Sequence, residues 1–243
     1  MPARYDTIGL NYANLRQPDA RIQAAIDQAL GPAKTVLNVG AGAGSYEPAN
    51  RDVTAVEPSE EMIRQRPANA APVSRGTAEE LPFEDKSFDA SMAVLTVHHW
   101  SDQAKGLREM RRVTRGPVVL LTYDPSFLGF WLADYVPQLI DLDERRMPRL
   151  AVYKACLGSV SITDVPIPQD CSDGFLCAYW RRPFAYLDPE VRKAMSSFWL
   201  IGDVSVAMAR LEADLNDGSW AKRYSDLEEL DACDPGYRLV VSQ

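Results

Sequence analysis

Apolar residues in the first half of the chain gather into short runs that alternate with amphipathic stretches. The apolar runs span residues 34–39, 52–56, 71–76, 87–95 and 116–124. Short, nearly continuous apolar runs predict buried strands of a parallel sheet. Three other stretches, 19–30, 58–66 and 101–113, place apolar residues at helical spacing. Their expected N-caps are Asp19, Ser59 and Ser101. Up to about residue 124, the sequence therefore predicts strands alternating with helices.

Two later segments supply further strands. Residues 159–168 and 236–243 contain many β-branched side chains, and each predicts a strand. Together with the earlier runs they predict a Rossmann-like, doubly wound α/β fold with a mostly parallel seven-stranded sheet. Ligands of such sheets bind beyond the carboxyl ends of the strands.

The rest of the chain has a helical pattern that predicts an insertion before the last strand. Residues 125–153 are rich in aromatic side chains, and Asp188 with Pro189 marks the start of a further helix. Another helix is expected to end at Gly218. Residues 170–189 mix aromatic side chains with two adjacent arginines, which favours a lid over the active face.

Composition and charge narrow the range of partners. Hydrophobic residues make up 46% of the chain and charged residues 25%, as in an ordinary globular protein. The net charge of −8 disfavours nucleic acid as a partner. No apolar run approaches the roughly 20 residues of a membrane span, and the N-terminal stretch lacks the apolar region of a secretion signal. We expect a cytoplasmic protein without a membrane partner, either a monomer or a homodimer.

The cysteines and histidines predict no metal site. The cysteines, at positions 156, 171, 177 and 233, show neither metal-ligand nor redox spacing, and the only two histidines lie elsewhere. Reduced thiols are expected in the cytoplasm.

A glycine-rich turn follows the first predicted strand. Gly40, Gly42 and Gly44 occupy alternate positions in VLNVGAGAG, residues 36–44. Glycine allows positive φ and lets a ligand approach bare backbone. The dinucleotide fingerprint GxGxxG would place a third glycine or alanine where this chain has Ser45, so the spacing favours a smaller nucleoside over a pyrophosphate. Glu57, at the end of the second strand, is suited to accept hydrogen bonds from ribose hydroxyls.

These segments resemble the class I S-adenosylmethionine-dependent methyltransferases, in particular the small-molecule branch (type 11) that includes quinone-biosynthesis C-methyltransferases. The resemblance is carried, in the family's order, by VLNVGAGAG (36–44), VTAVEPSEEM (53–62), GTAEELPFEDKSFD (76–89), VHHW (97–100) and LREMRRV (107–113). It implies methyl transfer from S-adenosylmethionine to O, N or C of a small, apolar or aromatic acceptor.

The resemblance also implies the organisation of a single methyltransferase domain. Residues 1–31 would form N-terminal cap helices and residues 32–124 the cofactor-binding core. Residues 125–235 would form a helical region with one strand on the acceptor side, and residues 236–243 the last strand.

By the same resemblance, cofactor-binding roles fall on specific residues. The methionine and ribose portions would be lined by Gly40, Ala41, Gly42 and Gly44, and the ribose diol would be held by Glu57. The adenine would be flanked by Pro58 and Met62 and faced by the Ala78 backbone and the Glu79 side chain. The sulfonium and amino-acid tail would pass beside Ala93 and Val94, and the cofactor would be covered by Tyr12 and Arg16.

The chain departs from the family pattern at two places. Asn38 stands where the family usually has Asp or Glu, which helps to hold the cofactor's ammonium end. Only eight residues separate Gly44 from Val53, which is too short for a full helix after the glycine loop. We expect another acidic group to compensate for Asn38 or the affinity for the cofactor to be lower. Another part of the chain, such as the insertion, would have to support the loop.

The adjacent His98 and His99 follow the fourth predicted strand. An imidazole can take a proton near neutral pH, so one of the two could serve as a base or anchor the acceptor. Alternatively, the pair orders the loop and caps the following helix. Of the two, His98 is the candidate catalytic residue.

Two other functions remain open. One is a non-catalytic or repurposed S-adenosylmethionine-binding protein, which would keep the nucleoside pocket without productive acceptor geometry. The other is an NAD(P)-dependent dehydrogenase, against which Ser45 and the absence of a hydride-transfer constellation both count.

Overall fold

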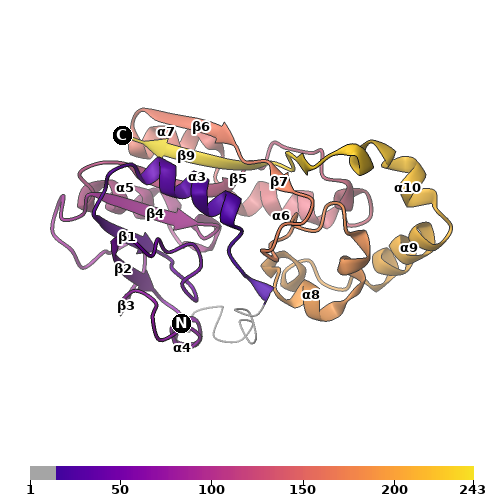
Figure 1. The fold of residues 1–243 in the computed structure, drawn as a ribbon, viewed down its shortest axis with the longest axis horizontal. Helices are drawn as coiled ribbons and strands as arrows, with labels where there is room; N and C mark the ends of the chain where they lie inside the picture. Colours follow the sequence, from indigo (N-terminus) through magenta and orange to yellow (C-terminus); the bar gives the residue numbers. More distant parts are fainter. Residues whose placement is uncertain (1–14) are drawn as a thin grey trace.

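The computed structural model describes residues 15–243, and a seven-stranded sheet lies at its centre (Figure 1). The strands are β1 Thr35–Val39, β2 Asp52–Glu57, β3 Val73–Arg75, β4 Ala90–Val94, β5 Val118–Tyr123, β6 Val160–Asp164 and β9 Tyr237–Ser242. They lie in the order β3–β2–β1–β4–β5–β9–β6. Strands β1 to β5 pair in parallel, and β9 runs antiparallel to β5 and β6. The predicted mostly parallel sheet is confirmed.

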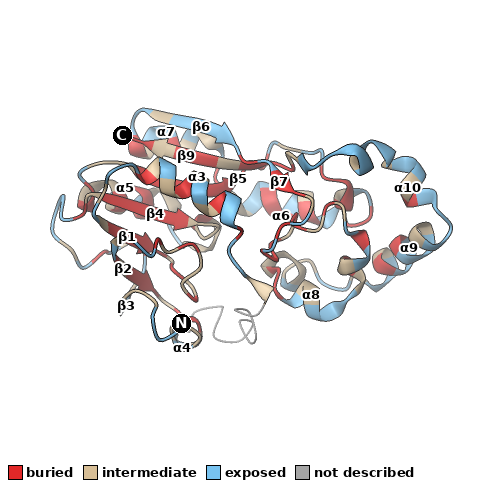
Figure 2. Ribbon diagram, viewed as in Figure 1, coloured by how far each residue is buried: buried red, intermediate tan, exposed pale blue. Residues whose placement is uncertain are grey.

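Helices cover both faces of this sheet. They are α3 Ala20–Leu30, α4 Glu60–Arg64, α5 Gln103–Val113 and α7 Leu150–Leu157. On one face, α3 buries Ile22, Ile26 and Leu30 against the sheet. On the other face, α5 and α7 pack together and bury Leu107 and Tyr153. The central strands β1, β4 and β5 are consequently buried on both sides (Figure 2), as the continuous apolar runs predicted, whereas the edge strands β3 and β6 are largely exposed.

The helix starts follow the sequence signals with one exception. Asp19 caps α3 and Ser59 caps α4, as predicted. The N-cap of α5 is Asp102, whose side chain accepts a backbone N–H in the first turn, so the prediction of Ser101 was wrong. The hydroxyl and backbone N–H of Ser101 donate to Glu79 instead.

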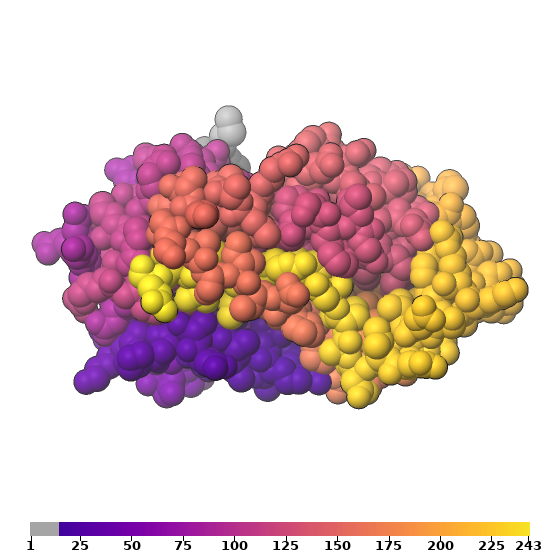
Figure 3. All heavy atoms as spheres, turned by 90° about the horizontal axis from the view of Figure 1, so that it is seen from above, coloured from indigo at the N-terminus to yellow at the C-terminus, as the bar shows by residue number. Residues whose placement is uncertain are grey.

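The predicted helical insertion forms a second lobe beside the sheet (Figures 1 and 3). Its elements are η2 Trp131–Asp134, α6 Gln138–Arg146, β7 Ile167–Pro168, η3 Pro183–Leu187, α8 Pro189–Lys193, η4 Ser196–Trp199, α9 Ser205–Asn216, α10 Ser219–Arg223, η5 Ser225–Glu229 and β8 Ala232–Cys233. The stretch 159–168 forms two strands, because β6 joins the main sheet and β7 pairs with β8.

Residues 170–189 belong to the core of this lobe and do not form a lid. Trp180 and Tyr186 are fully buried, and the Trp180 indole N–H donates to the Ile167 carbonyl at 2.9 Å. The adjacent Arg181 and Arg182 bind backbone carbonyls of the same lobe. Their guanidinium groups therefore stabilise the insertion.

The N-terminal part of the described chain packs on the sheet through α3. Between residues 15 and 243, no helix combines the length and apolar character that crossing a membrane requires.

Candidate functional site

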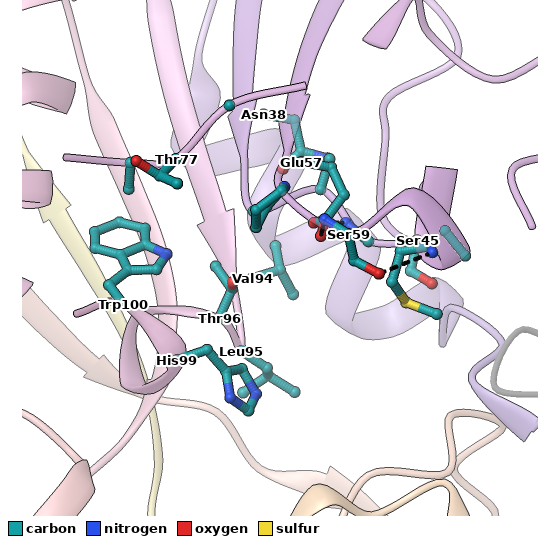
Figure 4. A pocket seen from close by; sticks show the side chains of 18 of the residues that line it. Asn38, Ser45, Glu57, Ser59, Thr77, Val94, Leu95, Thr96, His99 and Trp100 are labelled. Carbon is teal, nitrogen blue, oxygen red and sulfur yellow. Dashed lines mark hydrogen bonds between the residues drawn. The ribbon is translucent and has the colours of Figure 1, made fainter. Parts of the chain in front are cut away.

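A cavity of about 680 Å³ opens beyond the carboxyl ends of β1, β2 and β4 (Figure 4). Most of the residues predicted to bind a cofactor lie on its wall: Arg16, Gly40, Ala41, Gly42, Glu57, Pro58, Met62, Ala78, Glu79 and Val94. Gly44, Ala93 and His98 are not among the described residues that line it. Tyr12 lies outside the described residues. The sheet edge that the strand pattern indicated is therefore where the cavity lies.

The first glycine of the loop is required by packing. Gly40 follows β1 with φ of +68°, a conformation that costs little only for glycine. The backbone N–H groups of Gly40 and Ala41 donate to the Val56 carbonyl at 2.8 and 3.1 Å. A Cβ at position 40 would lie 2.2 Å from Oγ1 of Thr96. The close approach that excludes a side chain here comes from Thr96, within the protein itself.

Glu57 ends β2 with only 5% of its surface exposed. Its carboxylate accepts the N–H of Gly42 at 2.8 Å and the N–H of Ser59 at 2.9 Å, which fixes it in the cavity wall. Gly42 has φ of +54°, and a Cβ built there would approach only Met62, at 4.0 Å. Bare backbone and a fixed carboxylate thus lie side by side on the wall. A carboxylate in this position can accept hydrogen bonds from the hydroxyls of a sugar.

No helix follows the glycine loop, since residues 40–51 form turns and irregular structure. Arg66, beyond the end of α4, holds the loop instead. Its Nη2 donates to both carboxylate oxygens of Glu47 at 2.7 and 2.8 Å, and its Nη1 donates to the Gly42 carbonyl at 3.2 Å. A Cβ on Gly44 would lie 3.3 Å from this ion pair, so Gly44 packs against the support of the loop and away from the cavity.

The insertion supplies a second support. The side chain of Asp173 is fully buried. It accepts a hydrogen bond from Nε of Arg16 at 2.6 Å and another from the hydroxyl of Tyr46 at 2.9 Å. Tyr46 belongs to the segment after the glycine loop, and Arg16 lines the cavity. Asp173 therefore ties the insertion to both. This contact fulfils the expectation that another part of the chain supports the shortened loop.

The wall beyond β3 is organised around the start of α5. The Glu79 carboxylate accepts the N–H groups of Ser101 and Asp102 at 2.7 and 3.1 Å. Partial burial opposes ionisation, but these hydrogen bonds hold the pKa of Glu79 below its ordinary value. Trp100 lines the cavity next to this contact (Figure 4). The indole fits there because Gly106 has no side chain. A Cβ at position 106 would lie only 2.5 Å from Cε3 of Trp100.

The two histidines lie in η1 (Val97–His99), directly after β4, with ring centroids 3.9 Å apart. His99 lines the cavity (Figure 4), whereas His98 does not. Desolvation of the His98 ring, with the positive charges of Arg146 and Arg16, lowers the pKa of His98 to about 3. His98 is consequently neutral and weakly basic near neutral pH. The geometry does not support the choice of His98 as the base and favours His99 as the histidine that faces a ligand.

Several residues on the wall lie outside the predicted set. Thr96 and Trp100 flank the histidine pair, so the motif order could have indicated them. Arg146 could not be predicted from local sequence. It ends α6 and donates from Nη2 to the His98 carbonyl at 2.9 Å, across 48 residues of chain.

Comparison with known proteins places this geometry in a family. A family model for a methyltransferase domain matches residues 37–121. A crystal structure from Anabaena variabilis ATCC 29413, assigned as a methyltransferase from an antibiotic biosynthesis pathway, is 36% identical in sequence with a TM-score of 0.87. That alignment covers 94% of this chain and 99% of the other.

Two of the curated relatives each match about half of the chain. The uncharacterized methyltransferase YcgJ of Bacillus subtilis (strain 168) is 35% identical over 121 residues, which is 45% of this chain. The 2-methyl-6-phytyl-1,4-hydroquinone methyltransferase 1 of Oryza sativa subsp. japonica is 28% identical over 147 residues, or 54% of this chain. In each case the match spans 44% of the relative's own length. The near-complete match to the Anabaena structure shows the family: this chain belongs to the class I S-adenosylmethionine-dependent methyltransferases.

Proposed function

We propose that the protein transfers a methyl group from S-adenosylmethionine to O, N or C of a small-molecule acceptor. The observation that carries this proposal is the Glu57 carboxylate bound to bare backbone at Gly42, on the wall of a cavity of about 680 Å³. Bound S-adenosylmethionine supplies a methyl group already activated by its sulfonium. The residues of the chain then have to bind the cofactor and the acceptor, orient them toward each other and exclude water.

The residues on the wall fit the parts of this cofactor. Glu57 can accept hydrogen bonds from the ribose hydroxyls. The side chains of Met62 and Trp100 offer apolar surface to the adenine, and Val94 offers it to the sulfonium end. Arg16, positioned by Asp173, offers a guanidinium that is complementary to the cofactor's carboxylate.

The acceptor is assigned to the part of the wall formed by Leu95, His99 and Arg146. His99 is suited to take a proton from an acceptor that must lose one. An apolar or aromatic acceptor is supported by Leu95 and by the name of the rice relative, which specifies a phytyl hydroquinone. Arg146 adds one positive charge to this part of the cavity. A cytoplasmic monomer or homodimer stays a prediction.

A transfer experiment tests the proposal. The protein is incubated with S-adenosylmethionine labelled in its methyl group and a small-molecule extract, and the labelled products are separated by mass. We expect label in a small-molecule product together with S-adenosylhomocysteine, and much less of both from the Glu57→Ala variant at the same, sub-saturating concentration of S-adenosylmethionine. Binding of S-adenosylhomocysteine without any transfer would indicate a non-catalytic binding protein. Binding of NAD alone would indicate a dehydrogenase.

A further inference from the structure

Glu47 is a buried carboxylate that makes contact with both the glycine loop and the cavity wall. Its side chain is 8% exposed. It accepts Nη2 of Arg66 at both oxygens, the backbone N–H of Ala71 at 3.1 Å, and Nδ2 of Asn38 at 3.1 Å. The Arg66 guanidinium compensates its charge, and Asn38 is the neighbour that leads to the cavity.

The contact with Glu47 determines how the Asn38 side chain is turned. An ionised carboxylate only accepts hydrogen bonds, so the amide nitrogen of Asn38 must face Glu47. The amide oxygen of Asn38 is then turned away from Glu47. Asn38 lines the cavity beside Glu57 (Figure 4), although the whole residue is only 2% exposed.

The Asn38 oxygen has no hydrogen-bond donor within the part of the chain that the structure describes. This oxygen belongs to a residue that lines the cavity, and a carbonyl oxygen covered by a bound ligand is costly unless a donor of that ligand satisfies it. The cavity beside it is where such a donor can enter. A ligand group with several N–H donors and a positive charge suits this oxygen best, because hydrogen bonds to charged groups are the stronger ones.

We propose that Glu47 is a positioning residue: through Asn38, it presents an amide oxygen to the ammonium group of the bound S-adenosylmethionine. The inference rests on the proposed function, because it takes the ligand from there. The inference explains how the uncharged side chain of Asn38 can bind an ammonium group. The negative charge of Glu47 lies behind Asn38 and is neutralised by Arg66. Glu47 acts on the ligand only indirectly, because it fixes which atom of Asn38 faces the cavity.

The variant Glu47→Gln tests this directly. The oxygen of the new side-chain amide would take the position that Ala71 N–H and Arg66 both require, which leaves its NH₂ group facing Asn38. Asn38 would then have to turn its own oxygen to that NH₂ group and its own NH₂ group to the cavity, where it repels an ammonium. Two probes separate the effects: S-adenosylhomocysteine, which has the ammonium, and 5′-methylthioadenosine, which lacks the amino-acid end.

We expect Glu47→Gln to weaken S-adenosylhomocysteine binding about tenfold to hundredfold, the range for one lost hydrogen bond to a charged group. The affinity for 5′-methylthioadenosine should stay within about twofold. The exchanged pair Asn38→Asp with Glu47→Gln restores a carboxylate oxygen toward the cavity and should recover the affinity for S-adenosylhomocysteine. Thermal unfolding checks that each variant is folded.

A parallel loss of affinity for both probes would overturn the inference, because it would mean that Glu47 only supports the loop. Should Glu47→Gln fail to fold, Asn38→Ala tests the amide oxygen itself with the same two probes, since it removes the oxygen and leaves the ion pair. An unchanged affinity of Asn38→Ala for S-adenosylhomocysteine would also overturn the inference. A wild-type protein that binds neither probe would instead refute the proposed function.

Discussion

Asp143 carries the prediction with the best-defined magnitude. This carboxyl lies on α6, 9% exposed, beside a small apolar cavity lined by Tyr123, Phe130 and Leu139. Within the described chain, no donor forms a hydrogen bond to it, and burial raises its pKa from 3.8 to about 7. A buried carboxylate without a partner is costly, so the ionised form destabilises the fold.

The sign and size of the effect follow from linkage. Because the pKa of Asp143 is raised in the folded state, the folded protein binds this proton more tightly than the unfolded chain. Its contribution to stability is full below about pH 3.8 and is lost as pH rises to about 7. The folded-state pKa of about 7 lies about two pH units above pH 5, and each pH unit is worth about 1.4 kcal/mol. Between pH 5 and pH 8.5, the wild type therefore loses about 3 kcal/mol of unfolding free energy through this group.

The substitution Asp143→Asn removes the ionisation. Urea unfolding followed by tryptophan fluorescence at pH 5 and pH 8.5 gives the free energy of unfolding of both proteins. Relative to the wild type, the variant should gain about 3 kcal/mol on going from pH 5 to pH 8.5. Any constant cost of burying the amide cancels in this difference. The exposed Asp141→Asn on the same helix is the control, with an expected change below about 0.5 kcal/mol. A pH-dependent gain no larger than the control's would refute the reasoning.

Three further predictions concern the cavity and its supports. Gly40→Ala should cost about 2–4 kcal/mol of stability from strain and crowding, and clearly more than Gly158→Ala, which has positive φ but open space; equal losses in chemical denaturation would contradict this. Asp173→Asn should lower the free energy of unfolding by about 3 kcal/mol, because it breaks a buried ion pair. The exposed Asp170→Asn should lower it by under about 1 kcal/mol, and similar melting curves for the two variants would contradict this. His99→Gln should lower turnover more than tenfold with S-adenosylhomocysteine affinity kept within twofold, and loss of both together would argue for a structural role.

The sheet could be predicted because its signal is local. Buried strands such as β1 and β5 are continuous apolar runs, and the glycine loop follows β1 directly in the chain. Glu57 could be placed for the same reason, since the end of β2 lies beside the end of β1 in a parallel sheet. The position of this part of the site depends on strand order alone.

The remaining features depend on contacts between distant segments. Asp173 reaches Tyr46 across 127 residues, and Arg66 reaches Glu47 across 19, without any spacing that announces either pair. The aromatic residues of 170–189 fit a core as well as a lid by composition, and only packing decides between them. The choice between His98 and His99 depends on which ring the turn after β4 directs into the cavity, and adjacent positions do not reveal this.

Calorimetric titration of S-adenosylhomocysteine into the wild type and the Glu57→Ala variant tests the central claim most directly. We predict binding to the wild type and a loss of about 1–3 kcal/mol in the variant, the value of hydrogen bonds to a charged group. The control Glu60→Ala, which changes an exposed carboxylate outside the cavity wall, should bind like the wild type. Equal affinity of the wild type and the Glu57 variant, or no binding by either, would contradict the account.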